Sequence, residues 1–177
     1  MKTIPLVVSL LLSFATVSCA DELAERIVQF CQDHEKKQVG DGTCYALAAK
    51  ALEAAGGKPS SAYAERPAKG DYVWGKLVMI QEATAAGIKR TGRGGDIQPG
   101  DFIQFRDTQW EGKGGKGTYT LTFDHHTAIV EGVEGAGSHL RIYHQNVGGK
   151  MFVVEGFLIL NDLKKGWIRV YRPMPKD

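Results

Sequence analysis

The sequence predicts an α+β fold in which N-terminal helices pack on an antiparallel sheet of about five strands. Two stretches, 21–38 and 43–55, carry apolar residues at the spacing of three and four that is typical of a helix with one buried face. From residue 97 onward the pattern changes to short alternating segments separated by turn residues, as expected of strands. Helices followed by strands, rather than alternating with them, favour the α+β class.

Length and composition indicate one globular domain. The chain has 177 residues, of which 43% are hydrophobic and 24% charged, so it can bury a sizeable core. We find no internal repeat and no heptad pattern, and the 22 glycines indicate many loops. We therefore expect residues 21–177 to form a single domain.

The first 20 residues are typical of a signal peptide. Lys2 precedes an apolar run over 4–17, and a small residue, Ala20, marks the expected cleavage site. The run is too short to favour a membrane-spanning helix. Cys19 raises an alternative, a lipoprotein acylated at this cysteine, which we rank second because Thr16 stands where such signals usually carry Leu. In both cases we expect an exported protein, periplasmic or secreted, with no integral membrane segment in the mature chain.

The charge balance argues against a nucleic-acid partner. The net charge is +2, and it falls to +1 when Lys2 is removed with the signal segment. A nucleic-acid-binding surface needs a clear basic excess, whereas a small surplus is typical of a solvated surface. The sequence leaves the oligomeric state open.

Two predicted helices open the mature chain. The first, 21–38, is followed by the break VGDG at 39–42, and the second, 43–55, begins at an N-cap that we assign to Asp41 or Thr43. The second helix places Cys44 in its first turn. The expected buried residues are Leu23, Ile27, Phe30 and Cys31 in the first helix, and Leu47, Ala48, Ala51, Leu52 and Ala55 in the second.

The C-terminal half of the chain predicts the sheet. Segment 108–120 is rich in glycine and is expected to be a long hairpin loop, whose Trp110 and Tyr119 either line a substrate groove or pin the loop onto the sheet. Segment 73–87 is ambiguous between strand and helix. The five strands are expected at 99–107, 125–133, 139–147, 151–160 and 166–173.

Residues from three predicted elements could form one reactive site. Cys44 lies at a helix N-terminus, where backbone N–H groups and the helix dipole favour a thiolate of lowered pKa. His126 begins a predicted strand, and its imidazole could take the thiol proton. His144 and Asn146 lie on the next strand, where a third group could hold that imidazole in the right tautomer.

Four segments in order, DGTCYALA, PGDFIQF, HHTAIV and IYHQNV, resemble the CHAP and NlpC/P60 papain-like cysteine amidase-peptidases over about 38–172. HHTAIV, HQNVGGK and GWIRVYRP also resemble the BBC1/AIM3 cysteine-proteinase-fold domain. The resemblance implies a papain-like fold and an exported cysteine hydrolase that cleaves an amide bond, with peptidoglycan as the leading substrate.

Carried over residue by residue, the resemblance implies that Cys44 is the nucleophile, His126 the general base and Asn146 the orienting residue. His144 stands where the family carries Glu, and a neutral His can orient the base only through a hydrogen bond. Gln145 alternates to the other face of its strand and is interpreted as structural. No cofactor is implied.

Several alternatives remain open. Cys31 and Cys44 are an even pair in an exported chain and could form a disulfide. A non-enzymatic binding module on the same fold, with that disulfide or with a site made degenerate by His144, is the rival hypothesis. A zinc site from Cys44, His126 and His144 is a weaker alternative. His125 should point away from His126, because neighbouring residues of a strand face opposite sides.

Overall fold

The computed structural model describes residues 19–63, 71–114 and 117–176. The predicted signal segment therefore lies outside the described residues, except for Cys19 and Ala20, which belong to the first turn of a helix. Within these ranges, no helix has both the length and the apolarity needed to cross a membrane.

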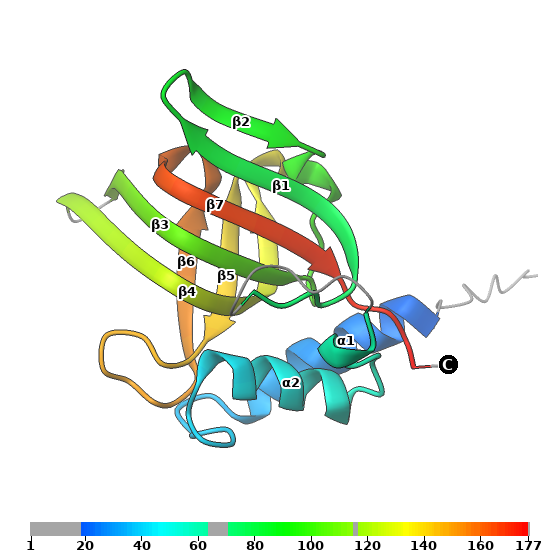
Figure 1. Cartoon of the computed structure of the whole chain (residues 1–177). Coiled ribbons are helices and arrows are strands. Elements are labelled where there is room, and N and C mark those ends of the chain that lie inside the picture. Colours follow the sequence, from blue (N-terminus) through cyan, green and yellow to red (C-terminus); the bar gives the residue numbers. More distant parts are fainter. Residues whose placement is uncertain (1–18, 64–70, 115–116, 177) are drawn as a thin grey trace, which may run out of the picture.

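Two helices lie together on one side of the sheet (Figure 1). Helix α1 spans Cys19–Asp33 and helix α2 spans Cys44–Ala54. Thr43, one of the two residues predicted as the N-cap, caps α2. Its side chain accepts a hydrogen bond from the backbone N–H of Ala46. All five residues predicted for the buried face of the second helix are buried: Leu47, Ala48, Ala51, Leu52 and Ala55.

The sheet has seven strands, in the order β2-β1-β7-β3-β4-β5-β6, and every neighbouring pair is antiparallel. The α+β class is confirmed, but the expected number of about five strands is wrong. The strands are β1 Lys76–Thr84, β2 Gly87–Thr91, β3 Phe102–Gly114, β4 Gly117–Glu134, β5 His139–His144, β6 Val154–Ile159 and β7 Leu163–Arg172.

Segments 73–87 and 108–120 explain why the sheet is larger than predicted. The ambiguous segment 73–87 holds β1, which turns directly into the edge strand β2. Segment 108–120 is not a loop, because β3 and β4 continue through it as a long hairpin. Gly112 pairs with Tyr119 in that hairpin, and a Cβ at Gly112 would come within 2.1 Å of the Asp162 side chain. A glycine here permits close packing rather than a loop.

The sheet separates two hydrophobic clusters. Alternation along β3 sends Phe102 toward the helices and Ile103 into the second cluster, on the opposite face. In β4, residues 126–130 are all buried, so this stretch is covered on both faces. The first cluster includes Leu23, Ile27, Cys31, Leu47, Leu52, Trp74, Phe102, Ile129 and Tyr143.

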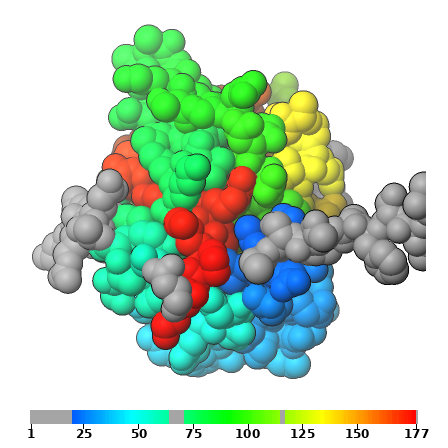
Figure 2. Space-filling view, turned by 90° about the vertical axis from the view of Figure 1, so that its right-hand side faces the viewer, coloured from blue at the N-terminus to red at the C-terminus, as the bar shows by residue number. Residues whose placement is uncertain are grey.

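The C-terminal segment ties the end of α2 to the sheet. The backbone N–H of Lys58 donates to the carbonyl of Met174, and the N–H of Lys176 donates to the carbonyl of Gly56. Figure 2 shows this segment, in red, between the helices below it and the β1–β2 hairpin above it. The end of β7 and the end of α2 are therefore held in one place.

A buried ion pair joins β7 to the turn before β3. Asp101 is 1% exposed, and Arg172 donates to its two carboxylate oxygens at 3.0 Å each. The same carboxylate accepts the backbone N–H of Gln98 at 2.9 Å, so Asp101 also caps the turn that precedes β3. Burial raises the pKa of Asp101, and the Arg172 contact opposes that shift.

We expect Asp101→Ala to lower the free energy of unfolding by about 3 kcal/mol, because it leaves the Arg172 guanidinium without its partner. Urea unfolding followed by circular dichroism measures the change. The matched control is Lys50→Ala, which removes a solvent-exposed pair with Glu53 and should leave the unfolding midpoint unchanged. Equal midpoints for the two variants would show that the buried pair does not stabilise the fold.

Candidate functional site

A network of local hydrogen bonds fixes the start of α2 and therefore the position of Cys44. The Asp41 carboxylate accepts the backbone N–H of Thr43 at 2.9 Å and its hydroxyl at 2.7 Å. The Thr43 oxygen in turn accepts the N–H of Ala46 at 3.1 Å. Cys44 therefore lies in the first helical turn, as predicted.

The Gln145 side chain holds the loop before α2 against the end of β5. Its amide nitrogen donates to the carbonyls of Val39 at 2.9 Å and Thr43 at 2.7 Å, and its oxygen accepts the N–H of Val39 at 3.2 Å. Gln145 is fully buried. Both amide N–H groups are used, so Gln145 has a structural role, as predicted, and neither is left to bind a substrate.

Two buried histidines form the centre of the site. His126 Nε2 and His144 Nδ1 lie 3.1 Å apart, and the side chains are 4% and 6% exposed. Phe123 stacks on His126 with ring centroids 4.7 Å apart and an interplanar angle of 12°. His125 points the other way and is exposed, as strand alternation predicts. Because Nε2 of His126 faces His144, its Nδ1 is the nitrogen left to exchange a proton.

The Cys44 sulfur lies beside the same part of β4. The backbone N–H of Thr127, the residue after His126, faces the sulfur, as do the N–H groups of Tyr45 and of Cys44 itself. Among the residues that the structure describes, no hydrogen bond joins the thiol to the His126 imidazole. The sulfur therefore lies beside Thr127, whereas His126 alternates with Thr127 onto the opposite face of β4, where its ring contacts Phe105 and Phe123 of the second hydrophobic cluster.

Burial controls the protonation of the site. It raises the pKa of Cys44, although the three backbone N–H groups act in the opposite direction. The pKa of His126 is lowered to about 3 by burial and by the neighbouring His144. That of His144 is lowered to about 4 by burial and by Lys150. The lowered thiol pKa predicted from the helix start is therefore wrong, and near neutral pH the site holds a thiol and two neutral imidazoles.

His144, rather than Asn146, makes the contact with His126. Strand β5 ends at His144, and Asn146 adopts a positive φ of 61°. That turn ends the two-residue alternation that would have placed both side chains on one face. Asn146 is exposed, and its backbone N–H donates to the Lys150 carbonyl at 2.8 Å. The orienting position predicted for Asn146 is occupied by His144.

Cys31 and Cys44 are not bonded to each other. Cys31 and Cys44 are both free thiols, so the disulfide alternative is not formed in this structure. Cys31 is fully buried in the first hydrophobic cluster, which is the packing role expected of its helix face. Across the described ranges, no group of three or more His, Cys, Asp or Glu side chains is placed to hold a metal ion.

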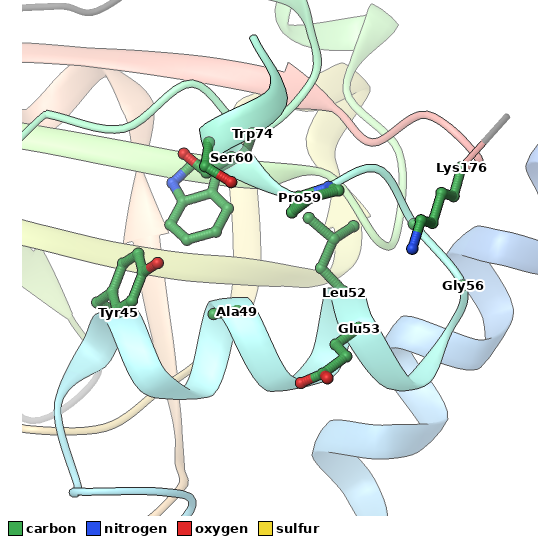
Figure 3. Close-up of a pocket in the computed structure, with 11 residues that line it drawn as sticks. Tyr45, Ala49, Leu52, Glu53, Gly56, Pro59, Ser60, Trp74 and Lys176 are labelled. Carbon is green, nitrogen blue, oxygen red and sulfur yellow. The ribbon is translucent and has the colours of Figure 1, made fainter.

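A cavity of about 270 Å³ runs along α2 from Tyr45, the residue after Cys44 in the sequence (Figure 3). Tyr45 and Trp74 stand at one end of it, with ring centroids 5.7 Å apart, and Lys176 stands at the other end. Ala49 and Leu52 form the side made by the helix. This cavity was not predicted from the sequence, although the closely spaced aromatic residues Tyr72 and Trp74, which pack against Tyr45, were a visible signal.

The two aromatic residues of the glycine-rich segment are packing residues. Trp110 is fully buried in the second hydrophobic cluster. The Tyr119 hydroxyl donates to the Asp162 carboxylate at 2.6 Å, and its ring packs edge-on against Phe157. Both side chains hold the β3–β4 hairpin in place, which agrees with the second of the two predicted roles.

Comparison with known proteins identifies the type of domain. Residues 15–177 match the family described as the AIM3/BBC1 cysteine proteinase-fold domain. A relative from the yeast Debaryomyces hansenii, altered inheritance of mitochondria protein 3, is 25% identical over 164 residues. That alignment covers 90% of this chain but only 17% of the relative, so the chain spans less than a fifth of its length.

Two solved structures show a weaker likeness. The crystal structure of Ly7917 is 18% identical, with a TM-score of 0.48, over 84% of this chain and 62% of that chain. The structure of Ly7917 with the hydrolyzing product of MDP is 19% identical, with a TM-score of 0.47, over 85% and 62% of the two chains. Both TM-scores lie below 0.5, so neither structure supports an inference about the chemistry of the site. That chemistry follows from the residues of this chain.

We expect Cys44 to react slowly with iodoacetamide at pH 7, because burial raises its pKa and the thiolate is the reactive form. The rate should still be rising above pH 9. Peptide mass mapping locates the label, and buried Cys31 in the same folded sample is the internal control. Rapid labelling of Cys44 at pH 6 would contradict a protonated resting thiol.

The histidine pair should make the fold sensitive to acid. Both folded pKa values lie below the ordinary value of 6.5, so the unfolded chain takes up protons first as the pH falls. The full free energy of unfolding is therefore present above pH 6.5 and decreases as the pH falls toward 4, by about 1.4 kcal/mol for each pKa unit of depression.

Urea unfolding at pH 7.5, 6.5 and 5 tests this dependence in a range where most carboxylates stay ionised. The His144→Gln variant, which cannot titrate there, should lose less stability over that range than the wild type. The exposed His139→Gln should behave like the wild type. Parallel losses in all three proteins would exclude the histidine pair as the source.

Proposed function

The chain belongs to the AIM3/BBC1 cysteine-proteinase-fold family, and on that premise we propose that it is a cysteine hydrolase that cleaves an amide bond by acyl transfer. The observation that carries the proposal is the placement of Cys44. Its sulfur lies at the start of α2, beside Thr127 of β4, the residue that follows His126, and His126 is paired with His144 of β5.

The reaction begins from a neutral thiol and a neutral imidazole. In the proposed step the thiol proton passes to Nδ1 of His126 through a bridging water, because the two side chains are not in direct hydrogen-bond contact, as the sulfur attacks the amide carbonyl. The resulting imidazolium keeps its Nε2–H directed at Nδ1 of His144, which holds the ring in place. His126 then gives its proton to the leaving amine, and water hydrolyses the thioester to release the acid and restore the thiol.

Backbone N–H groups supply the electrostatic stabilisation. The N–H of Cys44 opens α2 and has the position of an oxyanion donor, while the N–H of Thr127 faces the sulfur. His144 brings no negative charge to the imidazolium, unlike the Glu of related hydrolases. We therefore expect a modest rate, because one source of transition-state stabilisation is missing.

The leading substrate is an amide bond of peptidoglycan, either the link between sugar and peptide or a bond within the stem peptide. Two observations support this part of the proposal: the resemblance of the ordered segments to CHAP and NlpC/P60 enzymes, and the signal-like segment 1–20, which implies export to the periplasm or the exterior. The cavity between Tyr45 and Trp74 would receive a side chain on the acyl side of the bond.

The rival proposal is a binding module on the same fold that has no hydrolytic activity. It is favoured by the raised pKa of Cys44 and by the lack, in the described residues, of a thiol–imidazole hydrogen bond. In that case the Tyr45–Trp74 cavity would bind a peptide or glycopeptide, and Cys44 would be a packing residue.

Incubation with purified cell-wall sacculi separates these proposals. We expect the wild type to release soluble fragments that chromatography and mass spectrometry identify by the new amine or carboxyl end. Cys44→Ser should release none, and His126→Ala should be slower by about 10²- to 10⁴-fold. The matched control is the exposed His139→Ala, whose loss should leave the rate unchanged, and His125→Ala is compared with it because His125 shares a face of β4 with Thr127, beside the sulfur.

Equal release by wild type and Cys44→Ser would overturn the catalytic role of the cysteine. Binding of all variants to sacculi without any released fragment would favour the binding module.

A further inference from the structure

A second cavity, of about 300 Å³, lies beside His144. Strands β4, β5 and β6 form most of its wall, and the loop after β5 closes it with Lys150. Most of that wall is apolar, and it includes Leu121, Phe123, Ile142, Val154 and Phe157. Phe157 is 49% exposed, so the cavity has an open side toward solvent.

The imidazole of His144 presents one nitrogen to this cavity. Its Nδ1 faces His126, and its Nε2 has no hydrogen-bond partner among the described residues. The side chain is only 6% exposed. Gly156 lies opposite on β6, and a Cβ there would come within 2.9 Å of Nε2. The glycine therefore leaves open the space directly in front of Nε2, the one nitrogen of this largely buried side chain that faces the cavity.

The state of that nitrogen follows from the proposed base. If His126 is to accept a proton at Nδ1, its Nε2 carries hydrogen and donates to Nδ1 of His144. A neutral His144 must then carry its own hydrogen on Nε2. The cavity consequently holds one N–H donor without an acceptor, in the same wall as the cationic Lys150.

Glu155 does not supply the missing acceptor. It also lines the cavity, but it pairs with Tyr143 across β5 and β6, whereas His144 pairs with Val154, and no hydrogen bond joins its carboxylate to His144 among the described residues. The negative charge of Glu155 accordingly acts on Tyr143, whose pKa it helps to raise.

We propose that this cavity binds a small carboxylate attached to a short apolar chain. The carboxylate accepts the Nε2–H of His144 and lies near Lys150, while the chain packs on Phe123 and Val154. The proposal rests on the proposed function, because the role of His126 as base sets the tautomer of His144. Two sources share this chemistry: a fatty acid, and the C-terminal carboxylate of a peptide that ends in an apolar residue.

Binding would change the chemistry of the neighbouring pair. A carboxylate against His144 provides the negative charge that related hydrolases obtain from Glu, and it favours the protonated forms of His144 and His126. The ligand would therefore act as a removable third member of the site.

Calorimetry and the imidazole NMR signals of the full-length protein test the proposal with three probes. Hexanoate represents the lipid source, N-acetylleucine the peptide source, and hexanol is the neutral control. We expect at least one carboxylate to bind, to shift the His144 signals and to raise its pKa, whereas hexanol should not do so. The probe that binds more tightly identifies the source.

Variants locate the site. Gly156→Ala places a methyl group against Nε2 and should abolish binding, and Lys150→Gln should weaken it about tenfold. Gly114→Ala is the matched control, because its Cβ would meet nothing within 4 Å. Lys150 is exposed, so its variant is informative even if Gly156→Ala fails to fold.

The proposal is overturned if no carboxylate binds, if hexanol binds equally well, or if Gly156→Ala and Lys150→Gln both bind like the wild type. Binding does not depend on hydrolysis. Carboxylate binding without release of fragments from sacculi would leave the cavity assigned and the hydrolase proposal refuted, and the converse result would refute the cavity alone.

Discussion

The three hydrogen bonds of the Gln145 side chain are the constraint on which the candidate site depends. They hold Val39 and Thr43, on either side of the turn before α2, against the end of β5. Gln145 directly follows His144, the partner of His126. His144, the last residue of β5, thus orients the His126 imidazole, and Gln145, which follows it, fixes the loop that precedes Cys44. One short stretch of chain therefore couples the cysteine to the histidine pair.

This coupling explains why the site is buried and why it is neutral. The Gln145 hydrogen bonds hold the start of α2 against β4, where residues 126–130 are covered on both faces of the sheet. The Cys44 sulfur and the two imidazoles are therefore all shielded from solvent. Desolvation then outweighs the helix dipole at Cys44. Neutral reactants avoid the cost of two buried charges at rest, and charge separation is needed only when a substrate is attacked.

The sequence was most informative where periodic apolar spacing coincided with burial. Both helices, the buried face of α2 and the strands with His126 and His144 could be predicted for that reason. Strand β2 could not, because all of its side chains are exposed at the edge of the sheet and leave no alternating pattern. The position of Asn146 could not be predicted from strand alternation, because its positive φ ends that alternation after His144, although Asn followed by Gly148-Gly149 is a local sequence signal for such a turn.

The central claim is that Cys44 is a nucleophile served by His126, and reaction with an activated ester tests it without knowledge of the natural substrate. Intact mass measurement after mixing with p-nitrophenyl acetate should show one acetyl group, which peptide mapping places on Cys44. His126→Gln should acquire it about 10²- to 10⁴-fold more slowly. Acetylation of Cys44 at the same rate in both proteins, or no acetylation of Cys44 in the wild type, would contradict the account.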